Sequence, residues 1–250
     1  MKYFKGFWMA LGMFCGIPLP FHIWDEKHTS VMVASLPLVG GIIGFLWWLA
    51  GTALIYAEAP LVMSAAILTV VPFLITGFIH LDGYMDTSDA ILSYRPAPEK
   101  LRILKDPNVG AFAVIMLAIL LILQFAAVFT VTEQGTNLAL LIAIPVISRG
   151  CAAFSVYAVR HIPESNYTAM LAQNVKTTHK IFTAAIIITA VTAAVLYAGI
   201  TGLIAGLAVV ICFAAAMANA YRHFKGIAGD MIGYSLVIGE LGGLIAWVLF

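Results

Sequence analysis

Residues 80–89 of the chain read His80-Leu81-Asp82-Gly83-Tyr84-Met85-Asp86-Thr87-Ser88-Asp89, which places three carboxylates at the end of a long apolar run. In a helix, Asp82, Asp86 and Asp89 stand at positions i, i+4 and i+7 and therefore project from one face. Such a face repels itself unless a cation sits on it. We therefore predict an acidic helix that binds a cation; if the helix begins after Asp82, Asp86 and Asp89 still share a face.

The composition places this stretch in a membrane protein. Of the 250 residues, 62% are hydrophobic and only 10% are charged, which excludes an ordinary water-exposed surface. The basic residues are too sparse for a nucleic-acid-binding face. Three cysteines lie far apart in apolar segments, without the spacing of zinc or redox sites. We predict an all-α membrane helix bundle in which residues 1–250 form a single integral-membrane catalytic domain.

Apolar segments of about 20 residues predict the membrane-spanning helices. The run 6–17 is shorter and is closed by Pro18 and Pro20, so we expect a re-entrant or interfacial segment there. The aromatic residues that begin the chain, Phe14 among them, fit a belt at the membrane interface. About seven full spans are expected, at residues 31–56, 60–79, 109–131, 137–158, 181–198, 201–220 and 231–250, with a tight hairpin around Gly199.

The basic residues predict the topology. If the first segment does not cross, all 13 Lys and Arg fall on one side of the membrane, and the loops opposite keep only Glu58 and Glu133. Cytoplasmic loops are enriched in Lys and Arg. We therefore expect a multi-pass protein of the cell membrane whose cytoplasmic parts are the amino terminus and the loops around 22–30, 80–108, 149–180 and 221–230.

Acidic residues gather on the same side. Asp82, Asp86, Asp89, Asp106 and Asp230 belong to polar connections that are distant in sequence. Mg²⁺ prefers carboxylate oxygens and is commonly shared with substrate phosphates, whose remaining charge Arg and Lys bind. The pattern indicates metal-assisted phosphoryl transfer. Solvated carboxylates in the first turn of a helix need no metal, however, and that alternative stays open.

Three further features of the sequence have two interpretations each. Glu240 lies inside the last span, where an ionisable group is a functional candidate, but it could equally pair with Arg149 or Arg222. His80 is either a metal or phosphate ligand or a hydrogen-bonded polar residue at a helix end. The glycines near Asp230 let a ligand approach the backbone, as we expect at Gly226 and Gly229, or let two helices pack closely, as we expect at Gly233.

Three stretches resemble the cobalamin synthase family, whose members are also called adenosylcobinamide-GDP ribazoletransferases. The stretches are His80-Leu81-Asp82-Gly83-x-x-Asp86-Thr87-x-Asp89, Leu104-Lys105-Asp106-Pro107-Asn108-Val109-Gly110-Ala111-Phe112, and Gly226-Ile227-Ala228-Gly229-Asp230-Met231-Ile232-Gly233 with Glu240 downstream. The resemblance covers nearly the whole chain in the expected order. Ala90 stands where the family pattern has Gly, and Ala228 replaces a common Thr.

The resemblance implies that adenosylcobinamide-GDP is joined to α-ribazole, or to its 5′-phosphate, with release of GMP and with Mg²⁺ as cofactor. On this hypothesis Asp82, Asp86 and Asp89 are catalytic and, with Asp106, bind the metal. One carboxylate, not assigned, accepts the proton of the attacking hydroxyl. The residues expected to bind substrate or phosphate are His80, Arg102, Lys105, Asp106, Arg149, Arg222, Gly229, Asp230 and Glu240.

Two other classes of function fit the sequence less well. CDP-alcohol phosphotransferases also place spaced aspartates at a membrane boundary, but their Asp-Gly-x-x-Ala-Arg element is absent, because Asp82-Gly83 is followed by Tyr84-Met85-Asp86-Thr87. A cation-coupled transporter would use acids near the bilayer midplane, and only Glu240 suits that role. The sequence leaves open the oligomeric state, including a homo-oligomer, the number of metal ions and the preferred lower-ligand base.

Overall fold

The computed structural model describes residues 1–135, 138–163 and 165–250, and within them the chain is helical with no strand. The all-α prediction is confirmed. A short 3-10 turn, η1 (Glu26–His28), precedes α2. The helices are α1 (Lys2–Phe14), α2 (Thr29–Ala34), α3 (Leu36–Tyr56), α4 (Leu61–Ile75), α5 (Ile79–Leu92), α6 (Ala97–Ile103), α7 (Ala111–Glu133), α8 (Leu140–Ala158), α9 (Asn166–Leu171), α10 (Thr177–Phe224) and α11 (Gly229–Leu249).

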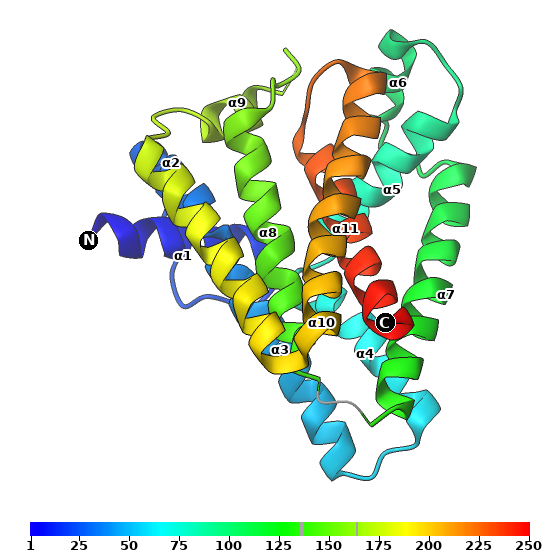
Figure 1. Ribbon diagram of the computed structural model, residues 1–250. Coiled ribbons are helices and arrows are strands. Elements are labelled where there is room, and N and C mark those ends of the chain that lie inside the picture. Colours follow the sequence, from blue (N-terminus) through cyan, green and yellow to red (C-terminus); the bar gives the residue numbers. More distant parts are fainter. Residues whose placement is uncertain (136–137, 164) are drawn as a thin grey trace.

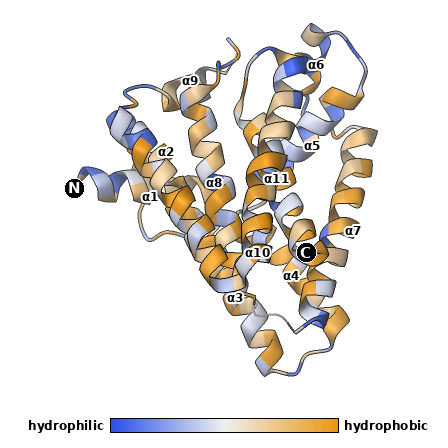
Figure 2. Cartoon of the chain, in the orientation of Figure 1, coloured by the Kyte–Doolittle hydropathy of each residue, from blue (hydrophilic) through white to orange (hydrophobic). Residues whose placement is uncertain are grey.

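Several of these helices can cross a membrane, so the protein is a multi-pass membrane protein. Helices α3, α7, α8, α10 and α11 are long and apolar enough, which gives 5 such helices in the described chain, or up to 6 if α4 and α5 form one bent span. Figure 2 shows how apolar these long helices are and how the polar residues gather on α6 and near the start of α1. The expected count of about seven stays a prediction.

The predicted span 60–79 is interrupted. Helix α4 has 15 residues and reaches about 22 Å, less than the roughly 30 Å of a hydrocarbon core. The chain then turns by 93° into α5. Gly77 and Phe78 occupy the turn with φ of +61° and +64°, a backbone conformation that ends a right-handed helix.

The amino-terminal segment closes on this turn. Helix α1 runs across the direction of α8 and α10 (Figure 1) and is not among the helices that could span a membrane. After α1, the backbone N–H of Gly16 donates a hydrogen bond of 2.7 Å to the carbonyl of Ile75. A Cβ on Gly16 would lie 2.9 Å from the nitrogen of Gly77. The first segment therefore packs against the break between α4 and α5.

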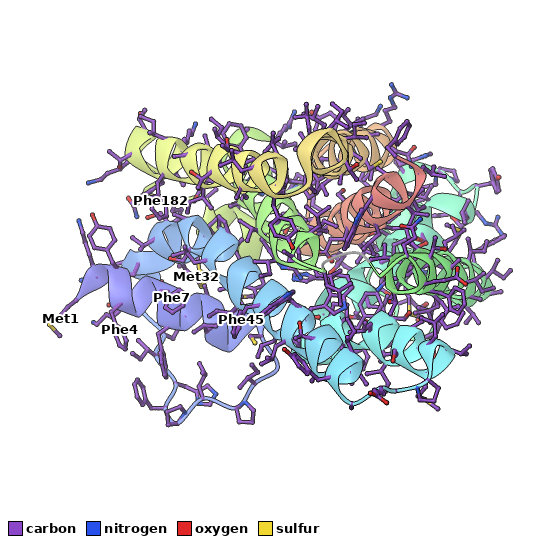
Figure 3. All side chains as sticks on the ribbon, turned by 60° about the horizontal axis from the view of Figure 1, so that its bottom comes forward. Met1, Phe4, Phe7, Met32, Phe45 and Phe182 are labelled. Carbon is purple, nitrogen blue, oxygen red and sulfur yellow. The ribbon has the colours of Figure 1, made fainter. Side chains whose placement is uncertain are left out.

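The aromatic residues of α1 have different surroundings. Phe4 is 54% exposed, as expected at a membrane interface, whereas Phe7 packs on the cluster that contains the buried Met32. Figure 3 shows Phe7 on the side of α1 that faces α2. Only part of the predicted interfacial belt therefore lies on the surface.

Helix α10 is one long element with a sharp reversal inside it. Gly199 has φ +58° and ψ −133°, which is not a helical conformation, and it divides the 48 residues into two arms. Figure 1 shows the yellow and orange arms meeting at this point. A Cβ on Gly202 would collide with the carbonyl of Ala194, so the arms touch close to the reversal. The predicted hairpin around Gly199 is confirmed.

Helices α3 and α8 pack through small residues. A Cβ added to Gly44 would lie 2.7 Å from the Cα of Ile142, and one on Gly40 would lie 2.8 Å from the carbonyl carbon of Pro145. Membrane helices associate mainly by such close packing, because lipid tails are as apolar as the side chains between the helices. Arg149 lies on α8 one turn beyond Pro145, so this contact also positions a residue of the predicted site.

The polar loops meet at one end of the bundle, as predicted. The Ile162 N–H donates to the Ile227 carbonyl at 3.0 Å, and the Ile227 N–H donates to the Arg160 carbonyl at 2.9 Å. The Nζ of Lys100 lies 2.8 Å from Nδ1 of His223. These contacts tie the loops that follow α5, α8 and α10 into one surface (Figure 1, top).

We predict that Gly199→Ala destabilises the protein by about 1–3 kcal/mol, because only glycine adopts this backbone conformation without strain. A Cβ at Gly199 would meet no atom within 4 Å, so the loss of stability would come from backbone strain and not from a steric clash. The measurement is thermal unfolding in detergent. Gly41→Ala is the control, since its Cβ would make an ordinary contact at 3.8 Å; equal melting temperatures for the two variants would contradict the prediction.

Candidate active site

The acidic stretch is helical in the predicted register. Helix α5 begins at Ile79, directly after the left-handed Phe78. Asp82, Asp86 and Asp89 therefore all lie within the helix, at i, i+4 and i+7, which confirms that their backbone positions share one side. Asp82 is exposed, whereas Asp86 and Asp89 are half-buried.

A close crossing of α5 and α11 brings a fourth carboxylate to this helix. A Cβ on Gly83 would lie 2.8 Å from both the Cα and the carbonyl oxygen of Asp230. One turn along α11, a Cβ on Gly233 would lie 3.2 Å from the carbonyl oxygen of His80. The two backbones are thus in direct contact at two points, so Gly233 has the packing role that was one of the predicted uses of such glycines.

The carboxylates of the two helices interact through their charges. Asp86 is subject to the negative charges of Asp82, Asp230 and Asp89, and Asp230 is subject to that of Asp82. We call Asp82, Asp86, Asp89 and Asp230 the acidic cluster. The predicted convergence of α5 with the Gly229-Asp230 connection is therefore confirmed, and the cluster is an environment that favours bound cations.

Asp89 has a structural contact of its own. Its Oδ1 accepts a hydrogen bond of 3.4 Å from the backbone N–H of Ala113 in the first turn of α7. A Cβ on Gly110, which precedes this helix, would collide with the Asp89 carboxylate. The carboxylate therefore lies at the positive end of α7, where an anion is stabilised without a metal. Asp89 is thus stabilised without a cation, but by the start of α7 and not, as the predicted alternative had it, by the first turn of its own helix.

The end of α6 and the loop that follows it carry three further residues predicted for the metal and the phosphates, Arg102, Lys105 and Asp106. Asp106 accepts hydrogen bonds from the backbone N–H and Nδ2 of Asn108 at 2.9 and 2.7 Å. These two bonds, and then the charge of Arg102, hold the pKa of Asp106 below its usual range. Arg102 and Lys105 are exposed. In the described chain Asp106 thus contacts its own loop and not the carboxylates of α5.

Glu240 is paired with Arg149 in the interior. The guanidinium Nη1 of Arg149 donates to Oε1 of Glu240, and the Ser148 hydroxyl donates to the same oxygen at 2.8 Å. Arg149 and Glu240 are 2% and 7% exposed. Of the two partners predicted for Glu240, Arg149 is confirmed, whereas Arg222 is exposed at the end of α10. Glu240 is the one acid that suited a cation-coupled transporter, and its charge is thus neutralised by Arg149.

Four of the predicted site residues line one small cavity of about 210 Å³. They are His80, Arg149, Gly229 and Asp230, and the cavity also touches α1, α2, α3 and α9. Phe14 lies at its wall, with its ring stacked on that of His80 at 6.1 Å between centroids. The sequence did not indicate this role for Phe14, because an aromatic residue near a membrane boundary is typical of the interface. Asp82 lies in a neighbouring open hollow beside Gly16 and Gly77.

The acidic cluster fits Mg²⁺ in its donor chemistry. Among the described residues, no three His, Cys, Asp or Glu converge closely enough to form a complete metal cage. Mg²⁺ seldom needs one, since it keeps several waters and is commonly held by one or two carboxylates together with substrate phosphates. Asp82 and Asp86 can supply those oxygens. Asp89 and Asp106, which have the partners described above, are less suited.

The fold and the site together define a multi-pass helical membrane protein with an acidic cluster at one end of the bundle. The family model described as Cobalamin-5-phosphate synthase matches residues 6–248. The chain belongs to this family, which confirms the resemblance identified in the sequence.

Relatives align with the chain over almost its full length. An adenosylcobinamide-GDP ribazoletransferase of Clostridium botulinum (strain Alaska E43 / Type E3) is 38% identical over 99% of this chain and 98% of its own. One of Clostridium perfringens (strain SM101 / Type A) is 35% identical over 97% of both chains. One of Geobacillus kaustophilus (strain HTA426) is 32% identical over 98% and 96%. No solved structure matches the chain.

We predict that Glu240→Gln destabilises the protein by about 3–5 kcal/mol, because it leaves the buried guanidinium of Arg149 without its counter-charge. Thermal unfolding of the purified protein measures the effect, with the exposed Glu133→Gln as a matched control. Adding Arg149→Met to Glu240→Gln removes the unpaired charge and should recover much of the loss. Unfolding of Glu240→Gln at the wild-type temperature would show that the pair is not important for stability.

We predict that Asp89→Ala lowers the stability of the protein more than Asp89→Asn does. Asp89→Ala removes an acceptor at the start of α7 and should cost about 1 kcal/mol; Asp89→Asn keeps an acceptor oxygen and should cost less. Hydrogen exchange of residues 111–114 reports this directly, and it should be faster only in Asp89→Ala. Unchanged exchange in that variant would rule out the contact as a helix cap.

Proposed function

We propose that this protein joins adenosylcobinamide-GDP to α-ribazole or its 5′-phosphate and releases GMP. The observation that carries the proposal is the glycine-mediated crossing at which Asp82 and Asp86 of α5 meet Asp230 of α11. Both helices carry motifs of the family to which the chain belongs, and the relatives bear the name of this transferase. The acidic cluster is the centre of the proposed site.

The reaction forms one bond and breaks another at a single phosphorus atom. A ribose hydroxyl of the ribazole attacks the phosphorus on the corrinoid side of the diphosphate. The new P–O bond forms as the bond to the GMP oxygen breaks, and GMP leaves with the electron pair. A carboxylate of the acidic cluster accepts the proton of the hydroxyl; Asp86 and Asp230 are the half-buried members that face one another's helix.

Bound Mg²⁺ would be held by Asp82 and Asp86 and would neutralise charge on the diphosphate. The positive side chains of the chain divide into two groups. Arg102, Lys105 and Arg222 are exposed, so they are free to bind phosphate oxygens that approach from solvent. Arg149 forms the second group. It is paired with Glu240 in the interior and lines the cavity beside Asp230.

The orientation of the site follows from the distribution of charge. The loops after α5, α8 and α10 meet at one end of the bundle, and they carry most of the Lys and Arg of the chain. Since positive loops stay in the cytoplasm, this arrangement supports a site that opens to the cytoplasmic face of the cell membrane. Water-soluble nucleotide substrates are available there.

The test is GMP release by the purified full-length protein supplied with both substrates. We expect wild-type activity to require Mg²⁺, and Asp82→Asn and Asp86→Asn each to lower the rate by about a hundredfold or more, the equivalent of about 3 kcal/mol of lost transition-state stabilisation. Glu58→Gln, an exposed acid in the connection between α3 and α4, is the matched control and should leave the rate unchanged.

Two results would contradict this proposal in different ways. No GMP release by the folded wild-type protein would refute the reaction itself. Wild-type rates in both aspartate variants, with the same dependence on Mg²⁺, would refute the acidic cluster as the site and leave the reaction in place.

A further inference from the structure

We infer that the enclosed cavity beside the acidic cluster binds the fused-ring aromatic base of the nucleoside substrate. This inference rests on the proposed function and adds to it the place where one of the two substrates is held. It assigns binding contacts to Phe14, His80 and Ala152. Four independent features of the cavity lead to it.

The first feature is size. The cavity holds about 210 Å³, the share of about seven water molecules in the liquid. This is enough for a flat bicyclic base, which consists of nine ring atoms and small substituents. It is far too small for a corrin macrocycle. A whole corrinoid substrate must therefore bind outside, and only a compact part of a ligand can enter.

The second feature is the character of the walls. They are mostly apolar and come from six helices around α8, so they are fixed by the packing of the bundle. Ala152, Leu36 and Leu171 are each at most 5% exposed. Phe14 and His80, which also line the cavity, are stacked with an angle of only 14° between their rings. Flat aromatic ligands bind well in such surroundings.

The third feature is a pair of buried nitrogens without partners. Nε2 of His80 and Nε of Arg149 are inaccessible to solvent, and neither has a hydrogen-bond partner among the described residues. Both residues line the cavity. A buried donor that is left unpaired is destabilising, and a ligand that accepts from it removes that cost. A base with one lone-pair nitrogen can accept from His80 when its proton is on Nε2 and its ring turns to present that nitrogen to the cavity.

These features favour a benzimidazole-like base over the guanine of the other substrate. Guanine carries three N–H donors on its edge, and Asp230 is the one carboxylate among the described residues that line the cavity. The inference assigns Asp230 to the ribose hydroxyl, so the donors of a guanine in this position would face mostly apolar walls at a high cost. Thr168, whose hydroxyl also lines the cavity, already bonds to Ser165. A base with an apolar edge and a single acceptor nitrogen matches apolar walls and unpartnered N–H groups.

The fourth feature is position. Gly229 and Asp230 line the same cavity, and a Cβ added to Gly229 would meet no heavy atom within 4 Å. The space beside this glycine, which precedes Asp230 of the acidic cluster, is therefore open. A base inside the cavity places its ribose at Asp230 and near Asp86, where a hydroxyl can lose its proton during the attack.

The experiment fills the cavity and measures the two substrates separately. Ala152→Leu adds three carbon atoms at a cavity wall, and we expect it to raise the KM for the ribazole at least about tenfold while the KM for adenosylcobinamide-GDP stays within about twofold. Direct binding of the ribazole to the full-length protein without the second substrate should weaken equally. Ala158→Leu, the same change in an exposed residue of the same helix, is the matched control.

A second variant covers a failure of Ala152→Leu to fold. Phe14→Ala removes the stacked ring from a half-buried position and should also weaken ribazole binding selectively. The inference is overturned if either folded variant binds the ribazole like the wild type, or if the KM that rises is the one for adenosylcobinamide-GDP. The KM comparison requires an active wild type, whereas direct binding of the ribazole does not. Absence of GMP release from the wild type would therefore refute the proposed function and leave the binding test in place.

Discussion

The close contact between α5 and α11 is the constraint on which the site depends. Two helix backbones approach this closely only where a residue of one helix has no side chain, and Gly83 and Gly233 are the residues at the two points of contact. In a membrane, apolar side chains gain little by leaving lipid for protein, so close packing of this kind contributes much of the cohesion between helices. The same two glycines that join the helices therefore bring Asp230 to Asp82 and Asp86.

The features of the fold that depend on local pattern could be predicted from the sequence. The spacing of the aspartates indicated the helix, the Lys and Arg indicated which loops share a side, and Gly199 indicated the reversal in α10. The interruption of the predicted span 60–79 by a sharp turn could not be predicted in this way. Hydropathy averages over the segment, whereas its end is decided by two backbone conformations with positive φ at Gly77 and Phe78.

The site was predicted less completely than the fold, because partners depend on how helices are rotated and packed. For Glu240 the sequence offered two arginines, and only the packing of α8 against α11 selects Arg149. Asp89 shares its face with Asp82, yet it lies against the start of α7. Phe14 reaches His80 because the first segment folds back under α5, which no periodicity in the sequence encodes.

The backbone pairing between the loops after α8 and α10 has a mechanical consequence. Ile227 is held through both its N–H and its carbonyl by residues 160–162, while the end of α10 stops at Lys225 in a left-handed turn. The start of α11 is therefore anchored through the backbone of Ile227 to the segment that follows α8. Asp230, three residues after Ile227, is thus held from two sides, by this anchor and by the contact of α11 with Gly83 of α5.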